Sequence, residues 1–231
     1  MPNLSHPNTR PGVTVLICAK NEAENLPYVL PKIPDLVDEI LVVDGHSTDG
    51  TVDVVRAFSP RARVISQKKF GKGDAVRLGI RESRGDIVVT LDADGQTDPA
   101  EIPRFVSVLL MGYDFAKGTR LLYGRPPEMQ FHKWLGNKVL VVAANILFHA
   151  RYTDIAAGYR AFWKGSIAKV KIRYDGGEMD QELQVKILKM GLRVKEVPYR
   201  HLPRLHGGSR FRDLPQGVRN LLAIFISFFE H

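Results

Sequence analysis

Short apolar runs alternate with helix-like segments along the first half of the chain. The runs are apolar on successive residues and rich in β-branched side chains, which is typical of strands buried on both faces of a parallel sheet. We predict strands at Val13–Ala19, Glu39–Val43, Arg63–Ser66, Asp86–Leu91 and Phe115–Lys117, and helices at Thr51–Phe58, Gly73–Glu82 and Pro99–Leu110. This alternation predicts an α/β fold with a mainly parallel central sheet and helices on both faces.

The second half is less regular. It is predicted to contain helices at Phe131–Ala150, Met179–Met190 and Val218–Phe229, a strand at Arg193–Tyr199 and a basic, glycine-rich loop at Leu202–Arg212. Two stretches, Val139–Phe148 and Leu221–Phe229, are nearly all apolar but fall short of the roughly 20 residues that a spanning helix needs. Each could pack in the core or lie on a membrane surface. We therefore predict one domain followed by an amphipathic C-terminal segment.

The composition favours an anionic partner. Lysine and arginine total 33 against 25 aspartates and glutamates, for a net charge of +8. Such a surplus suits a phosphorylated substrate, anionic lipid headgroups or nucleic acid, and charge alone does not choose among them. The single cysteine, Cys18, lies in an apolar run, so we interpret it as a small core residue in a reducing compartment.

The sequence Asp92-Ala93-Asp94-Gly95 directly follows the predicted strand that ends at Leu91. Two carboxylates one residue apart, with no lysine or arginine beside them in the sequence, could hold Mg²⁺ or Mn²⁺ together with substrate phosphates. The alternative is a solvated turn. Glu22 and Asp44 also follow predicted strands, and the carboxyl ends of parallel strands share one edge of a sheet. We therefore expect all four carboxylates to lie along one rim.

Gly71-Lys72-Gly73 precedes a predicted helix. Glycines at such a position allow backbone N–H groups to approach a phosphate, and Lys72 adds positive charge. The alternative is a flexible turn with a solvated lysine. The spacing of a Walker loop is absent, and no GxGxxG follows the first strand, which argues against a dinucleotide site.

Taken together, these motifs resemble family 2 glycosyltransferases with the GT-A fold. The resemblance is carried by the segments Val15–Glu22, Val42–Thr51, Gly71–Ala75 and Asp92–Gln96. Further segments resemble the branch that glycosylates dolichyl or polyprenyl phosphate, which includes dolichol-phosphate mannose synthases: Gly118–Arg120, Asp154–Phe162, Glu196–Pro198 and Arg204–Arg210. The resemblance implies a GT-A catalytic domain over residues 1–212 and a C-terminal, membrane-interfacial helix over residues 213–231.

The resemblance also implies roles for individual residues. Glu22 and Asp44 would hold the nucleoside, and Lys72 would lie beside the nucleotide pocket. Asp92, Asp94 and Gln96 would share the metal, Mg²⁺ or Mn²⁺. Phosphates of the donor or acceptor would face Arg120, Arg204, Ser209 and Arg210, and Glu182 would lie near the sugar.

The implied activity is metal-dependent, inverting transfer of a hexose (mannose, glucose or GlcNAc-type) from a GDP- or UDP-sugar to dolichyl or polyprenyl phosphate. The enzyme would work peripherally at the cytoplasmic face of a membrane. An enzyme that glycosylates a hydroxyl, such as one of a glycan or phosphoglycerate, is the alternative. A non-catalytic nucleotide-sugar or nucleic-acid binding protein is a further one, although a basic sheet without interleaved exposed aromatics is a poor platform for nucleic acid.

Overall fold

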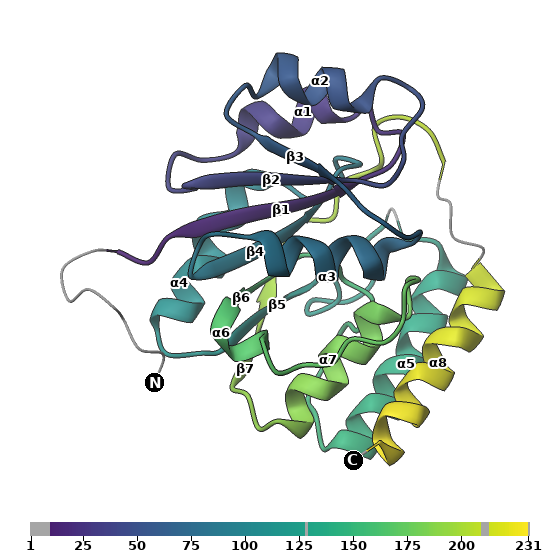
Figure 1. The fold of residues 1–231 in the computed structure, drawn as a ribbon. Helices are drawn as coiled ribbons and strands as arrows, with labels where there is room; N and C mark the ends of the chain where they lie inside the picture. Colours follow the sequence, from purple (N-terminus) through teal and green to yellow (C-terminus); the bar gives the residue numbers. More distant parts are fainter. Residues whose placement is uncertain (1–9, 128, 209–212, 231) are drawn as a thin grey trace.

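The structure, a computed structural model, describes residues 10–127, 129–208 and 213–230. Within this part of the chain, a seven-stranded sheet has the order β3-β2-β1-β4-β6-β5-β7 (Figure 1). The strands are β1 (Val13–Ala19), β2 (Glu39–Asp44), β3 (Arg63–Ser66), β4 (Ile87–Asp92), β5 (Phe115–Thr119), β6 (Arg160–Trp163) and β7 (Val194–Pro198). The five strands predicted in the first half are therefore present, with bounds that differ by two residues at most.

The sheet is mainly parallel, as predicted. β1 to β4 pair in parallel, and so do β5 and β7. β6 is antiparallel to both of its neighbours, β4 and β5. This strand is missed by a search for apolar runs because it has only four residues and begins with the buried Arg160.

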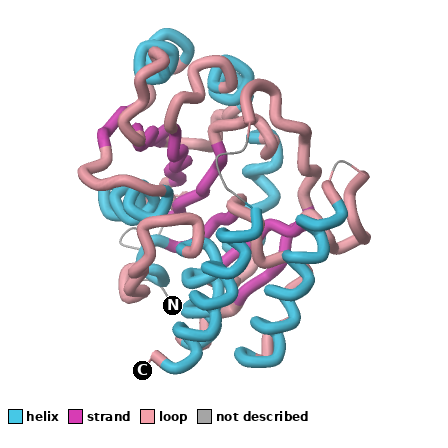
Figure 2. The backbone as a smooth tube through the Cα atoms, turned by 90° about the vertical axis from the view of Figure 1, so that its right-hand side faces the viewer, coloured by secondary structure: helices cyan, strands magenta, loops and turns pink. Residues whose placement is uncertain are grey.

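Helices cover both faces of the sheet, because successive side chains of a buried strand point to opposite sides. One face packs against α1 (Leu26–Val29), α2 (Thr51–Phe58) and α4 (Ile102–Leu110), and the other against α3 (Lys72–Glu82), α6 (Lys164–Ile167) and α7 (Met179–Lys189). In a view turned by 90°, helices lie on either side of the strands (Figure 2). Two short 3₁₀ helices, Leu30–Lys32 and Pro99–Glu101, complete the connections.

A further layer lies outside α7 and consists of α5 (Phe131–Phe148) and α8 (Asp213–Phe229) (Figure 1). Ile224 of α8 packs with Leu140 and Ala144 of α5 and Val185 of α7. α8 begins five residues before the predicted Val218, immediately after the predicted domain boundary. Among the described residues, no helix is long and apolar enough to cross a bilayer.

Gly79 marks a close approach between α3 and β1. A Cβ on Gly79 would lie 2.2 Å from Cδ1 of Leu16. Gly79→Ala is therefore expected to lower the free energy of unfolding by about 1–3 kcal/mol, as overpacked cores do. Gly136 of α5 is the control, because nothing lies within 4 Å of a Cβ placed there. Gly136→Ala should instead raise the free energy of unfolding by up to about 1 kcal/mol through helix propensity. Urea denaturation measures both, and a stabilised Gly79→Ala would contradict the packing.

Candidate active site

Acidic side chains gather where β1, β2 and β4 end. Asp44 and Asp92 are the last residues of β2 and β4, and the strand register sets them on either side of β1. Glu22 follows the end of β1, and Asp94 follows the end of β4. Ligands of open α/β sheets bind beyond this edge. We call these four residues (Glu22, Asp44, Asp92 and Asp94) the carboxylate rim.

Arg204, from the segment after β7, neutralises two members of the rim. Its Nη2 lies 2.7 and 2.8 Å from the two carboxylate oxygens of Glu22, and its Nη1 lies 3.0 Å from Oδ2 of Asp94. Glu22 also accepts a hydrogen bond of 2.7 Å from Asn25 Nδ2. The expectation that these carboxylates have no basic residue beside them is therefore wrong for the folded chain. Arg204 is 110 residues from Asp94 in the sequence and adjacent to it in space.

The pKa of Asp94 lies above its ordinary value. Burial and the charge of Asp92 raise the pKa of Asp94 to about 6, although the Gln96 N–H and Arg204 oppose the shift. The Gln96 N–H donates to Oδ1 of Asp94 at 3.1 Å, and the Gln96 side chain lies 3.3 Å from His201 Nε2. The structure thus brings Asp92, Asp94 and Gln96 together, beside the segment that carries Arg204.

Lys72 joins the rim to α7. Its Nζ lies 3.1 Å from Oδ1 of Asp92 and 3.2 Å from Oδ2 of Asp180. Burial lowers the pKa of Lys72, but Asp180 and Asp92 outweigh burial and hold this pKa above its usual value. Asp180 also pairs with Arg160 of β6, which is 1% exposed. We call this row (Asp92, Lys72, Asp180 and Arg160) the buried charge chain.

Asp180 and Glu182 point to different parts of the protein. Residues two positions apart on a helix are separated by about 200° around its axis, so these two side chains cannot share a face. Glu182 accepts hydrogen bonds from the N–H groups of Arg173 and Tyr174 and pairs with Lys186 at 2.6 Å. The carboxylate that α7 presents to the rim side is therefore Asp180, whereas the sequence prediction named Glu182.

Arg120 is held by the fully buried Asp154. Its Nε and Nη2 lie 2.7 and 3.0 Å from the two oxygens of Asp154, which is a bidentate pair. Asn137 of α5 donates to the same carboxylate at 3.0 Å. Burial lowers the pKa of Arg120, but Asp154 outweighs it and raises the pKa, and Asp92 contributes in the same direction. Arg120 therefore stays charged, and the charge of Asp92 contributes to this.

The glycines beside Lys72 admit another part of the backbone. A Cβ on Gly73 would lie 2.0 Å from the carbonyl oxygen of Tyr174, and one on Gly71 would lie 2.2 Å from that of Asp175. The Gly73 N–H donates to the Asp175 carbonyl at 2.7 Å. This N–H is therefore engaged within the protein, and the approach of other N–H groups of the turn to a phosphate stays a prediction. The alternative of a flexible turn is not found, because the glycines let residues 174–175 pack tightly here.

The part of the rim that contains Glu22 and Asp44 is built from two joined loops. The Ser47 N–H lies 3.3 Å from both carboxylate oxygens of Asp44. Asn21 accepts a hydrogen bond of 2.8 Å from the Thr48 N–H, so the loop after β1 is fixed to the loop after β2. A polar cavity of about 400 Å³ opens beside these loops, lined by residues 21, 23–25, 49, 204 and 206–208. Ser209 and Arg210 lie outside the described residues.

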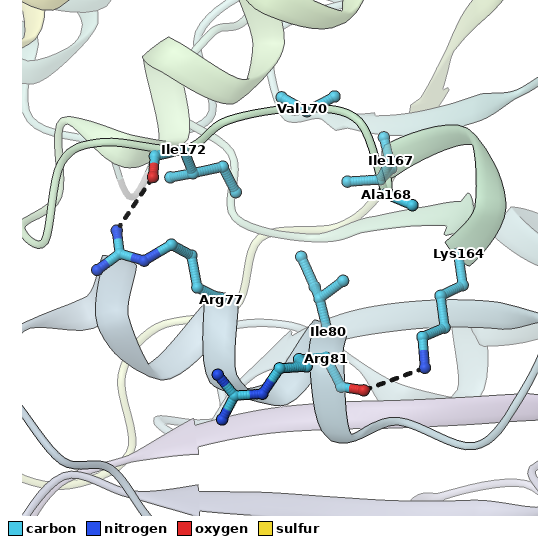
Figure 3. A pocket seen from close by; sticks show the side chains of 8 residues that line it. All are labelled: Arg77, Ile80, Arg81, Lys164, Ile167, Ala168, Val170 and Ile172. Carbon is cyan, nitrogen blue, oxygen red and sulfur yellow. Dashed lines mark hydrogen bonds between the residues drawn. The ribbon is translucent and has the colours of Figure 1, made fainter.

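A second cavity of about 330 Å³ lies between α3 and α6, near the start of β4 rather than its end (Figure 3). Its floor is apolar, and its cations are engaged within the protein. Arg77 Nη1 donates to the Tyr174 carbonyl at 2.9 Å, and Lys164 Nζ donates to the Arg81 carbonyl at 3.2 Å. This cavity is therefore not part of the rim.

Cys18 packs beside the buried charge chain, in the hydrophobic cluster between the sheet and α3. Burial raises the pKa of its thiol to about 12. The thiol is therefore protonated at neutral pH and unreactive. This agrees with its interpretation as a core residue.

The donor set of the rim suits a hard divalent cation. Within the described ranges, no group of three or more histidine, cysteine, aspartate or glutamate side chains is arranged to hold a metal ion by itself. Asp92 and Asp94 with the Gln96 side chain offer a partial set of oxygen ligands. Mg²⁺ and Mn²⁺ bind well to such sets because they retain water and share substrate phosphates. Burial raises the pKa of Asp94, the neighbouring charges of Asp92 and Glu22 add to the shift, and a cation would offset those charges.

Sequence reasoning did not assign roles to Asp154, Arg160 or Asp180. Asp154 and Arg160 offered a signal, because they lie among mostly apolar residues, whereas Asp180 has polar neighbours and offered none. Ionisable residues are rarely buried unless they are paired. The sequence does not reveal the partners, because each pair joins segments distant along the chain.

Comparisons with known proteins identify relatives over most of the chain. The family model described as "Glycosyl transferase family 2" matches residues 14–167. Glycosyltransferase AglJ of Haloferax volcanii is 33% identical over 210 residues, covering 89% of this chain and 68% of that protein. The undecaprenyl-phosphate mannosyltransferase of Micrococcus luteus is 30% identical over 215 residues, covering 86% of each.

Solved structures share the fold. Glucosyl-3-phosphoglycerate synthase of Mycobacterium tuberculosis, crystallised with Mn²⁺, UDP and glucosyl-3-phosphoglycerate, matches with a TM-score of 0.78 and 23% identity. The match covers 94% of this chain and 80% of that one. Together with the family match, it confirms the predicted GT-A fold.

The Arg120–Asp154 pair should make stability depend on pH. Burial alone would raise the pKa of Asp154, but Arg120 and Lys117 outweigh it and hold the pKa far below its ordinary value. The stabilisation is therefore present above the unfolded pKa of about 3.9 and is lost as the pH falls below it. Asp154→Asn should lower the free energy of unfolding by about 3–5 kcal/mol at pH 7 and by less at pH 3.

Urea denaturation at the two pH values tests this. The control is Asp53→Asn, whose exposed pair with Arg56 is 3.5 Å long and should contribute under about 0.5 kcal/mol. An equal loss for Asp154→Asn at both pH values would show that the ion pair does not cause the stabilisation.

Proposed function

Because this chain belongs to glycosyltransferase family 2 and is a glycosyltransferase, we propose that it moves one hexose from a GDP- or UDP-sugar onto a polyprenyl or dolichyl phosphate. The transfer is metal-dependent and inverts the anomeric centre. The acceptor is supported by the name of the Micrococcus luteus relative. The divalent metal is supported by the Mn²⁺ and UDP in the crystals of the structural neighbour and by the donor set of the rim.

The donor occupies the carboxylate rim in this proposal. Glu22 and Asp44 bind the nucleoside, and Asp92, Asp94 and Gln96 hold Mg²⁺ or Mn²⁺. When bound, the ion supplies Lewis-acid stabilisation of the negative charge on the departing diphosphate. Lys72 lies beside the diphosphate and remains protonated, as the direction of its pKa shift requires.

The observation that carries the choice of acceptor is the state of the α7 carboxylates. Transfer to a hydroxyl needs a general base, whereas a phosphate oxygen is already anionic near neutral pH. Both oxygens of Asp180 are in ion pairs, one with Lys72 and one with Arg160, and Glu182 is engaged by Lys186 and two backbone N–H groups. Neither is poised to take a proton, which favours a phosphate acceptor over the hydroxyl alternative.

Two phosphorylated substrates repel each other, and arginine side chains would reduce this repulsion by neutralising the phosphate charges. Guanidinium groups stay charged and bind phosphate oxygens in pairs. Arg120 and Arg204 are assigned to these phosphates, and so are Ser209 and Arg210 beyond the described residues. Arg204 already spans from Glu22 to Asp94, so its guanidinium lies between the proposed nucleoside and metal positions.

An apolar surface supports work at a membrane. α5 and α8 bury one side in the protein and expose the other, with side chains that are 40–73% exposed: Phe131, Leu135, Val139, Val142, Ile146, Val218, Leu222, Phe225, Ile226, Phe228 and Phe229. Helices of this kind lie in the interface with the apolar face toward acyl chains. We propose peripheral attachment at the cytoplasmic face, with residues 1–212 as the catalytic domain and residues 213–231 as an interfacial helix.

Label transfer tests the reaction. The protein is incubated with UDP- and GDP-hexoses, Mn²⁺ and a short polyprenyl phosphate, and label entering the organic phase is measured. Asp94→Ala should reduce the rate at least about 100-fold, because loss of Lewis-acid stabilisation costs several kcal/mol. Asp53→Ala, on the exposed side of α2, should retain the rate.

A rate for Asp94→Ala within about threefold of the native one would contradict the metal role. Label that enters only a water-soluble acceptor would establish the hydroxyl alternative. Retention at the anomeric carbon, seen by NMR of the product, would exclude the inverting mechanism.

Flotation with vesicles of phosphatidylglycerol and phosphatidylcholine tests the membrane surface. The double variant Ile146→Glu/Phe229→Glu replaces side chains that are 68% and 73% exposed. It should bind at least about tenfold more weakly, because burying each apolar side chain contributes roughly 1.5–3 kcal/mol. Met111→Glu, 74% exposed at the end of α4, is the matched control and should bind normally. Equal binding by both would contradict the assigned surface.

A further inference from the structure

The buried charge chain joins four elements through alternating charges. Asp92 ends β4, Lys72 begins α3, Asp180 lies in the first turn of α7 and Arg160 begins β6. Exposure falls along the row from 35% of the Asp92 side chain through 22% for Lys72 and 11% for Asp180 to 1% for Arg160. Two carboxylates and two cations balance, so this row has no net charge. Such a row persists in a buried place only if each charge is paired.

The ammonium group of Lys72 lies at nearly the same distance from two carboxylates. Its Nζ is 3.1 Å from Asp92 and 3.2 Å from Asp180. Asp180 cannot move away from Lys72, because its other oxygen is bound to Arg160. Arg160 in turn is fixed by its Nε, which lies 3.3 Å from both Thr90 Oγ1 and the Gly158 carbonyl.

The other side of this row is closed by the backbone. A Cβ on Gly158 would lie 2.8 Å from Oδ2 of Asp92 and 3.0 Å from Lys72 Nζ. The Gly158 carbonyl also accepts a hydrogen bond of 2.7 Å from Thr90 Oγ1. Asp92 and Lys72 therefore meet in a confined space, where the strength of their mutual pairing depends on what else Lys72 contacts.

A cation beside a metal ligand weakens the metal site, because it neutralises the ligand and repels the ion. If Lys72 were paired with Asp92 alone, the rim would offer less negative charge to a divalent cation. Asp180 draws part of the Lys72 charge away from Asp92. Burial raises the pKa of Asp180, but Arg160 and Lys72 outweigh it and lower the pKa, so Asp180 is ionised at neutral pH.

We propose that Asp180 is a positioning residue for the donor site, and that by sharing Lys72 it leaves Asp92 charged enough to bind a divalent cation. The proposal rests on the function proposed above, because it takes the cation to be held by Asp92 and Asp94. Asp180 acts through Lys72 and does not contact the reacting atoms. A carboxylate at this position serves the site through its charge rather than as a base.

The test measures Mn²⁺ binding, from the electron paramagnetic resonance of free Mn²⁺, with saturating UDP in one series and GDP in another. Asp180→Asn keeps the shape and removes the charge, and it should weaken Mn²⁺ binding about 10- to 100-fold, as loss of a partner behind a metal ligand does. Asp180→Glu keeps the charge and should remain within about threefold of the native affinity.

The double variant Asp180→Asn/Lys72→Met decides the mechanism. With Lys72 removed, Asp180 is no longer needed to divide its charge, so Mn²⁺ affinity should return to within about threefold of the native value. Label transfer by this variant should stay low, because Lys72 is also placed beside the diphosphate. Glu39→Gln is the control: it breaks a partly buried pair with Arg63 of 2.9 Å at the opposite ends of the strands, and it should leave Mn²⁺ affinity unchanged.

The outcomes separate the two proposals. Native protein that binds no Mn²⁺ with either nucleotide would overturn the metal role in the proposed function. Native binding with an unchanged Asp180→Asn would overturn the role of Asp180 alone. Weak binding by the double variant, with an unfolding midpoint equal to that of the native protein, would also overturn it, because Asp180 would then act on the metal without Lys72.

Discussion

The structure depends on charge balance at the carboxyl edge of the sheet. A parallel sheet ends its strands together, so the carboxylates that follow β1, β2 and β4 are forced into one place. Burial raises the pKa of Asp94, and the charges of Asp92 and Glu22 raise it further. Basic side chains from other segments neutralise these charges. Arg204 pairs with Glu22 and Asp94, and Lys72 pairs with Asp92.

The two cations are held in different ways. Lys72 begins α3 and pairs with a carboxylate on each side, one from β4 and one from α7, so elements of regular structure hold it. Arg204 is similarly shielded but lies in a segment without regular structure. A fixed cation can maintain the shape of a site, whereas a cation on a loop can change partners when substrates arrive with their own charges. This difference fits Lys72 to a supporting role and Arg204 to phosphate binding.

The fold and the strand ends could be predicted from the sequence because both follow from local patterns. Apolar runs located β1 to β5, and the residues after them were necessarily at the ligand edge. The enzyme class was implied by the resemblance of several motifs to family 2 glycosyltransferases, and the family match confirms it. The ion pairs could not be predicted, because Arg204 and Asp94 are 110 residues apart. The sequence prediction named Glu182, whereas the structure presents Asp180 to the rim side, and this difference had another cause. A motif locates the first turn of a helix, but tertiary packing decides which side chains of that turn face the site. The roles of the individual site residues stay predictions.

The apolar surface and Arg120 are physically connected through α5. Asn137 and Ala144 of α5 are both buried, while Val142 and Ile146 on the same helix are more than half exposed. Asn137 donates to Asp154, and Asp154 holds Arg120 in its bidentate pair. The helix that presents apolar side chains outward therefore also orients an arginine assigned to phosphate. The proposed acceptor has a phosphate head and an isoprenoid tail. One helix would then set the distance between the proposed membrane surface and the arginine proposed to bind the phosphate. A water-soluble acceptor would require no such connection.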